Sequence, residues 1–207
     1  MNAFKHLAVL LALVNTAYAQ MATELQDIQV PPGRLFQKGY SLTPLNEKGW
    51  KIAERNPYQL TLDKPGGNPA EALMIQALII RLPPFKSNEE FIQQVKDVQV
   101  NNIDLMRVSL LKYDLRPYAK KGRHCVRSHV AAEERGAFEK SGNSGTPGKR
   151  VMTELVSLIC AHPKNKQIGV NVTYAHRYYA GQKEDPVFLE KAEKLIDSVK
   201  FTGASGI

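Results

Sequence analysis

The clearest hydrophobic pattern lies in the last third of the chain. Residues 151–160 and 168–179 are strand-like runs with alternating side chains, and the short segment 163–166 between them predicts an antiparallel hairpin. Residues 186–199 repeat their apolar side chains at helical spacing, and Asp185 is placed to cap the first turn. The pattern therefore predicts a β-hairpin covered by an amphipathic helix.

The register of this hairpin can be predicted from its turn. A shorter or a longer turn both place Ile159 opposite Val170 and Leu155 opposite Tyr174. We expect this face of the hairpin, which is mostly apolar, to meet the core. The opposite face then carries Cys160, Val156 and Glu154.

Three earlier segments complete the predicted fold. Residues 73–82 are apolar on both faces, which predicts a strand in the middle of a sheet. Ser87 and Glu90 match a capping box, so a first helix should begin there. Short strand-like runs around Trp50, between residues 39 and 62, predict an edge hairpin. The fold class that follows is α+β, an antiparallel sheet with about two main covering helices.

The region between residues 133 and 149 lacks a regular pattern. It is rich in residues that break regular structure: Gly136, Gly142, Gly145, Pro147 and Gly148. We expect a flexible loop here, either a lid or a loose connection between two neighbouring strands. Residues 20–207 should otherwise form a single α+β domain.

Residues 1–19 have the pattern of a secretory signal peptide. Lys5 supplies the positive start, residues 7–14 form an unbroken apolar run, and residues 17–19 end in small side chains. We predict cleavage after Ala19 and a periplasmic or secreted location. The apolar run is far shorter than the roughly 20 residues that cross a bilayer, so we predict no transmembrane anchor.

The chain has 2 cysteines, Cys125 and Cys160. In an oxidising compartment such a pair normally forms a disulfide. The alternative is a reactive cysteine, but there is no CxxC spacing to favour it. A structural disulfide is therefore the preferred interpretation.

A disulfide would place residues 125–132 as a strand beside the hairpin. Antiparallel pairing then puts Arg127 opposite Leu158 and His129 opposite Val156, with Glu154 diagonally close to His129.

Alternation assigns four polar side chains to the non-core face near one end of the sheet: His129, Glu154, Arg177 and Tyr179. Such a group can bind a small anion or act as acid and base. The structural alternative is a surface ion pair between Glu154 and Arg177. We predict no metal site and no cofactor, because His124 and His129 point to opposite faces of one strand and no HExxH motif occurs.

The chain is basic, with a net charge of +8. Arg107 opens a stretch rich in cations, in which the predicted basic strip comprises Lys112, Arg116, Lys120, Lys121, Arg123 and Arg127. One interpretation is a surface that binds phosphate or carboxylate groups. The other is a solvated strand edge that discourages pairing between sheets. Possible partners are an envelope protein or an anionic envelope polymer, and export makes nucleic acid the least favoured.

The order of these elements resembles the PsbP-like fold. The resemblance is carried by Pro44 before Gly49-Trp50, the central strand, the helix that begins at Ser87 and the closing run 195–201. In that fold an antiparallel sheet lies between helices, and the resemblance implies non-catalytic accessory or partner-binding roles. It implies no functional residue, and the cysteines and the basic strip do not belong to the matched pattern.

The preferred functional hypothesis is an exported protein without catalysis that binds an envelope component through its basic edge. A second hypothesis is a periplasmic hydrolase that uses His129 and Glu154 beside the loop 133–149. A third is a purely structural role in the envelope.

Overall fold

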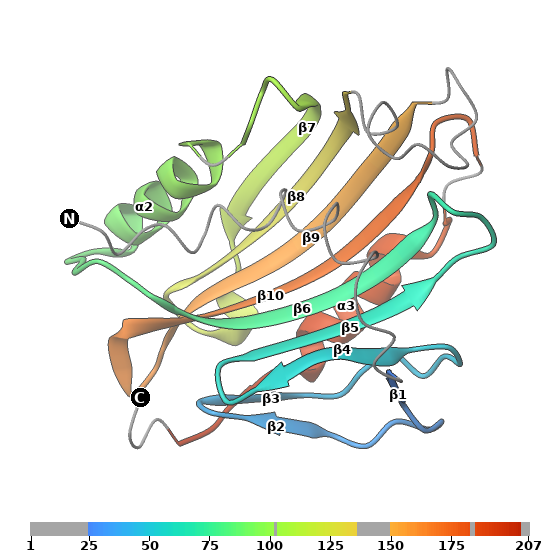
Figure 1. Ribbon diagram of the computed structural model, residues 1–207. Coiled ribbons are helices and arrows are strands. Elements are labelled where there is room, and N and C mark those ends of the chain that lie inside the picture. Colours follow the sequence, from blue (N-terminus) through green and yellow to red (C-terminus); the bar gives the residue numbers. More distant parts are fainter. Residues whose placement is uncertain (1–24, 102, 136–149, 183–184, 204–207) are drawn as a thin grey trace.

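The computed structural model describes residues 25–101, 103–135, 150–182 and 185–203 (Figure 1). The predicted signal peptide, and the predicted flexible loop from residue 136 onward, lie outside the described residues. Within them the chain is an α+β protein in which two antiparallel sheets dominate.

The strands are β1 (Gln26–Asp27), β2 (Leu35–Gln37), β3 (Tyr40–Leu42), β4 (Lys51–Asn56), β5 (Gln59–Pro65), β6 (Ala72–Arg81), β7 (Val108–Pro117), β8 (Cys125–Glu134), β9 (Val151–His162), β10 (Asn165–Tyr179) and β11 (Lys200–Phe201). The helices are α2 (Asn88–Asn101), α3 (Phe188–Ser198) and the short 3-10 helix η2 (Ala119–Lys121).

The large sheet has the strand order β1-β4-β5-β6-β10-β9-β8-β7. The predicted central strand is β6, which joins the β4–β5 hairpin to the long β9–β10 hairpin. The predicted edge hairpin corresponds to β4 and β5, with the short β1 outside it, whereas β3 belongs to a separate sheet of order β11-β3-β2. At the other end, β7 pairs only with β8 and is an edge strand.

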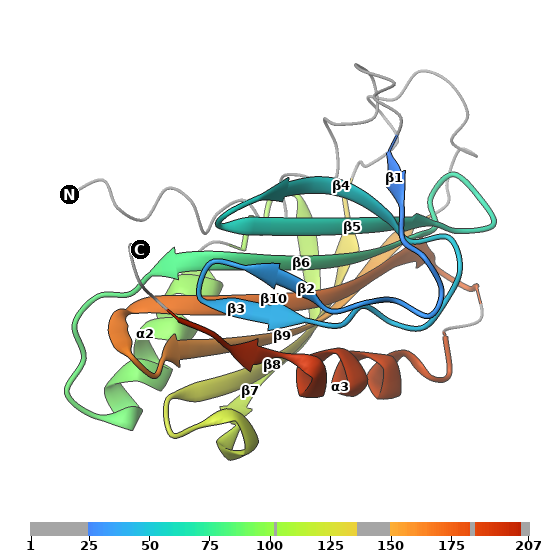
Figure 2. The same cartoon turned by 90° about the horizontal axis from the view of Figure 1, so that it is seen from below.

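The largest core lies between the large sheet and α3. Ala192 and Ile196 of α3 pack with Val172 and Tyr174 of β10, and Trp50 belongs to the same cluster. In Figure 2, α3 and the three-stranded sheet follow one another across this side of the large sheet. We call this side the α3 face.

The predicted cap of α3 lies slightly before the helix. The helix begins at Phe188, two residues after Pro186, and Asp185 caps the turn that leads into it. Oδ1 of Asp185 accepts a hydrogen bond from the backbone N–H of Val187 at 3.1 Å. The Asp185 carboxylate therefore stabilises the start of α3 from outside the helix.

The first helix packs on the opposite side of the sheet, the α2 face. Phe91 of α2 belongs to a cluster with Val126 and Ile159. The predicted capping box is half formed, because Oγ of Ser87 accepts from the N–H of Glu90 at 3.2 Å. The Glu90 carboxylate accepts from the backbone of residue 86 instead of from Ser87.

The predicted hairpin register is wrong by one residue. Tyr174 lies opposite Val156 and Val170 lies opposite Cys160, because the pairing is irregular between Asn165 and Gly169. An irregularity of this kind shifts every pair that follows it. As a result Val156 and Cys160 of β9 face the α3 core, whereas Leu155 and Ile159, which were expected there, face α2.

The predicted disulfide between Cys125 and Cys160 is confirmed. The two cysteines lie directly opposite one another on β8 and β9. The predicted pairs Arg127 with Leu158 and His129 with Val156 are also confirmed.

Candidate functional site

His129 and Glu154 form a close pair on the α3 face, where neighbouring strands β8 and β9 hold them. Nε2 of His129 lies 2.6 Å from Oε1 of Glu154. The imidazole is 4% exposed and the carboxylate side chain 18%, so the carboxylate is the more exposed partner. An ionised carboxylate only accepts hydrogen bonds, so Nε2 of His129 carries the proton.

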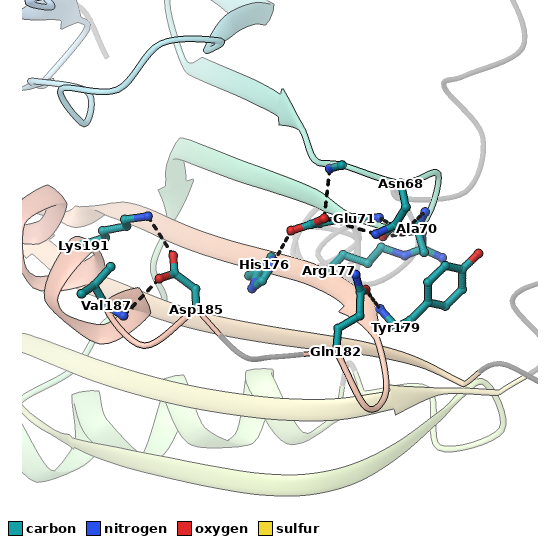
Figure 3. Close-up of polar contacts among 11 residues, drawn as sticks. Asn68, Ala70, Glu71, His176, Arg177, Tyr179, Gln182, Asp185, Val187 and Lys191 are labelled. Atoms are coloured by element: carbon teal, nitrogen blue, oxygen red, sulfur yellow. Dashed lines mark hydrogen bonds and ion pairs between the residues drawn. The ribbon is translucent and has the colours of Figure 1, made fainter.

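A second imidazole continues this arrangement on the next strand. His176 of β10 lies directly opposite Glu154 of β9. Its Nε2 is 3.7 Å from Oε1 of Glu71, which precedes β6 (Figure 3). Glu71 is itself positioned by the preceding turn, since its Oε2 accepts from Nδ2 of Asn68 at 3.2 Å. We call His129, Glu154, His176 and Glu71 the histidine–carboxylate row.

Burial lowers the pKa of His176, although the carboxylates of Glu71, Asp185 and Glu154 oppose this effect. Its ring also stacks on Tyr178, with ring centroids 4.7 Å apart. The neutral form of the imidazole is therefore favoured in the folded protein.

Charges next to the row are paired at the start of α3. Nζ of Lys191 lies 2.8 Å from Asp185 and 3.0 Å from Glu47, and Nζ of Lys64 lies 2.6 Å from Glu47. Burial raises the pKa of Asp185, but hydrogen bonds from Lys191 and Val187 outweigh it and the pKa is lowered. These carboxylates are therefore held in the ionised form.

Arg177 lies on the other face of the sheet, so the predicted pair with Glu154 is wrong. Arg177 follows His176 directly on β10 and lies opposite Thr153, whereas Glu154 lies opposite His176. The guanidinium of Arg177 instead binds both carboxylate oxygens of Glu134, at 2.9 and 3.0 Å. Successive residues of a strand point to opposite faces, and this separates the two groups.

The structure therefore divides the four predicted polar residues into two pairs. Tyr179 shares the α2 face with Arg177 and packs with Ala70 and Val151. His129 and Glu154 share the α3 face with the main core, and not the non-core face that the register had predicted.

Sequence reasoning missed two members of the row, His176 and Glu71. By alternation His176 shares the face of Tyr174, which was expected to be an apolar core face, and nothing along the chain connects it to a residue more than a hundred positions earlier. Only the pairing of β10 with β6 brings these two residues together.

The row can exchange protons and bind a polar group. Each imidazole of the row faces a carboxylate, Glu154 beside His129 and Glu71 beside His176. The described residues contain no group of three or more His, Cys, Asp or Glu arranged to hold a metal ion. General acid–base chemistry is what the geometry allows.

The predicted basic strip does not form one surface. Arg127 is buried on the α3 face, with Nε 2.6 Å from Oε1 of Glu193 in α3. Arg116 pairs with Asp114, and Nζ of Lys121 donates to two backbone carbonyls at the end of α3. The remaining members are exposed and form no ion pair within the part of the chain that the structure describes: Lys112, Lys120 and Arg123.

A different surface appears where α2 leads into β7. Here five large apolar side chains are exposed within twelve residues: Val100, Leu105, Met106, Leu110 and Leu111. Three cations accompany them: Arg107, Lys112 and Arg135. We call these eight residues the β7 surface. It lies around an outer corner of the molecule, at the top of Figure 1, away from α3.

Part of this surface could have been found in the sequence. Leu110 and Leu111 are consecutive, and on an edge strand two successive side chains do not share one buried face.

No helix in the described part of the chain is long and apolar enough to cross a membrane. Comparison with protein-family models and with curated proteins gives no match for this chain.

Proposed function

We propose that this protein is an exported, non-catalytic accessory protein that binds an anionic component of the cell envelope through the β7 surface. The observation that carries the proposal is that two cations of this surface are exposed and unpaired among the described residues. Arg107 and Lys112 are exposed beside uncovered apolar side chains and have no carboxylate partner among the described residues. Exposed cations next to apolar surface favour an anionic partner.

Two further observations support export and an accessory role. The disulfide between Cys125 and Cys160 is of a kind that persists in oxidising compartments, and residues 1–19 have the pattern of a signal peptide. The resemblance of the element order to the PsbP-like fold implies accessory or partner-binding roles.

The test is a charge-matched comparison of binding to anionic vesicles and to soluble polyphosphate. The double variant Arg107→Gln/Lys112→Gln should weaken binding by roughly 30-fold, since each cation near an anionic surface contributes about 1 kcal/mol. The control Lys48→Gln/Lys200→Gln removes the same charge from exposed lysines outside the β7 surface. Binding should also weaken as salt rises. Equal losses in the two double variants would contradict the proposal.

A second candidate function rests on the contact between His129 and Glu154. A buried imidazole 2.6 Å from a carboxylate is arranged as in a general base that is oriented by its partner. A hydrolase of this kind should turn over one member of a panel of small esters, phosphates and glycosides. His129→Asn should abolish that turnover, whereas Lys194→Gln, on the exposed side of α3, should not change it. Turnover that survives His129→Asn would remove this candidate.

A further inference from the structure

We propose that the β7 surface docks on an anionic phospholipid bilayer, with Leu105 and Met106 inserted past the lipid headgroups to the acyl chains. This inference rests on the proposed function, and it names the envelope component that the surface would bind.

The tip of the surface is held in a defined turn. The backbone N–H groups of Arg107 and Val108 both donate to the carbonyl of Asp104 at 2.9 Å. The N–H of Met106 donates to Oδ1 of Asp104 at 3.0 Å. Leu105 is 61% exposed and Met106 85% exposed. Their exposure therefore belongs to a hydrogen-bonded turn that presents two apolar side chains outward.

Cations lie in the turn and on the neighbouring strands, and the carboxylates at the end of β8 are in ion pairs. Arg107 is in the turn itself and Lys112 follows on β7. Nη2 of Arg135, at the end of β8, donates to Oγ of Ser109 at 3.2 Å, so a third cation lies beside the start of β7.

The acidic residues of the adjoining strand do not cancel this charge. The carboxylate of Glu133 lies 3.0 Å from Arg150, and Glu134 binds Arg177 on the α2 face. In the turn, the Asp104 carboxylate accepts from the neutral backbone N–H of Met106, so its charge offsets only part of the charge of the three cations. The described charges next to the apolar tip are therefore mainly positive.

This combination fits a bilayer better than a protein strand. A regular edge strand can pair with a strand of another protein, but β7 is irregular between Leu110 and Lys112. Bulges and lysines on an edge oppose such pairing. A projecting apolar tip with cations behind it matches the surface of a bilayer, in which anionic headgroups cover apolar acyl chains.

The experiment uses the disulfide-bonded mature chain, residues 20–207, with vesicles of phosphatidylcholine alone or of phosphatidylcholine and phosphatidylglycerol in equal parts. Sedimentation should show binding to the anionic vesicles and little to the neutral ones. Leu105→Ser/Met106→Ser should weaken binding to the anionic vesicles by about 10-fold or more. The control Leu189→Ser, at an exposed apolar position of α3 outside the surface, should change it by less than about 2-fold.

Fluorescence from an added tryptophan gives an independent readout of insertion. Trp50 is the single tryptophan and is buried in the core, so Met106→Trp adds one exposed reporter. Its emission should shift to shorter wavelength on anionic vesicles and be quenched by lipids with brominated acyl chains. The quenching requires the ring to reach the acyl chains, whereas the shift reports a less polar environment around the ring.

The outcomes separate the two proposals. Binding that depends on Arg107 and Lys112 but not on Leu105 and Met106, with no quenching, would overturn insertion and leave the proposed function standing. Binding to polyphosphate but not to vesicles would have the same meaning. A chain that binds neither vesicles nor polyphosphate would overturn both.

Discussion

Lys64, Lys191 and Arg127 on the α3 face each have a carboxylate within 3.0 Å, whereas Arg107 and Lys112 at the β7 edge have none among the described residues. The difference follows burial. A cation that packing has partly removed from water needs a partner, because an unpaired charge there is costly. A cation at an exposed edge has no such need. Charge on the α3 face therefore serves the fold, whereas Arg107 and Lys112 at the β7 edge form no ion pair among the described residues.

The largest effect should come from breaking a pair that is buried. Glu134→Gln would leave the guanidinium of Arg177 without a charged partner, and these two side chains are only 11% and 14% exposed. We expect the free energy of unfolding, measured by urea titration, to fall by about 3 kcal/mol. Arg150→Gln breaks the pair with Glu133, in which the arginine is 68% exposed, and should cost less than about 1 kcal/mol. Similar losses would contradict the link between pairing and burial.

The contact between His129 and Glu154 should give the next largest effect. Glu154→Gln keeps the shape of the side chain but removes the charge that accepts from the imidazole. We expect a loss of about 1.5–2 kcal/mol in the free energy of unfolding, the lower part of the range for a hydrogen bond to a charged group. A double-mutant cycle with His129→Gln should recover most of this loss as coupling between the two residues. Additive losses would show that the pair does not act as a unit.

His176 should contribute to the pH dependence of stability. Its folded-state pKa is lowered by burial, so the unfolded chain binds the proton more readily than the folded chain does. Stability from this residue is complete above the usual histidine pKa of about 6.5 and is lost as the pH falls below it, by at most about 1.4 kcal/mol per pH unit. Glu71, Asp185 and Glu154 face the ring and oppose this loss.

Urea titrations at successive pH values test this behaviour. His176→Gln should flatten the loss of stability on the acid side relative to the unmodified protein. An unchanged slope would mean that the protonation of His176 is not linked to folding.

Local sequence patterns predicted most of the fold. The main error was the hairpin register, and it arose because both faces of the sheet are apolar and buried. The central strand and both helices each follow from a short stretch of chain, and the disulfide follows from the presence of two cysteines. The register of the β9–β10 hairpin does not, because α2 and α3 bury both faces and Leu155 and Val156 are equally acceptable at a core position. The irregular pairing between Asn165 and Gly169 then decides which one faces α3.

The candidate site shows the same division. His129 and Glu154 could be placed together because the disulfide sets the register of β8 on β9. The contact of His176 with Glu71 depends on β10 pairing with β6, and that of Arg177 with Glu134 spans two strand pairings. Contacts of this kind depend on tertiary arrangement and leave no local signal.

The smallest expected change in stability belongs to the β7 surface. Arg107→Gln/Lys112→Gln should alter the free energy of unfolding by less than about 0.5 kcal/mol, because no described carboxylate loses a partner and the side chains stay in water. The same double variant is the one expected to lose vesicle binding. A stability loss comparable to that of Glu134→Gln would assign these cations to the fold and remove the contrast with the α3 face. An unchanged melting curve with lost binding would instead show that β7 carries charge that folding does not use.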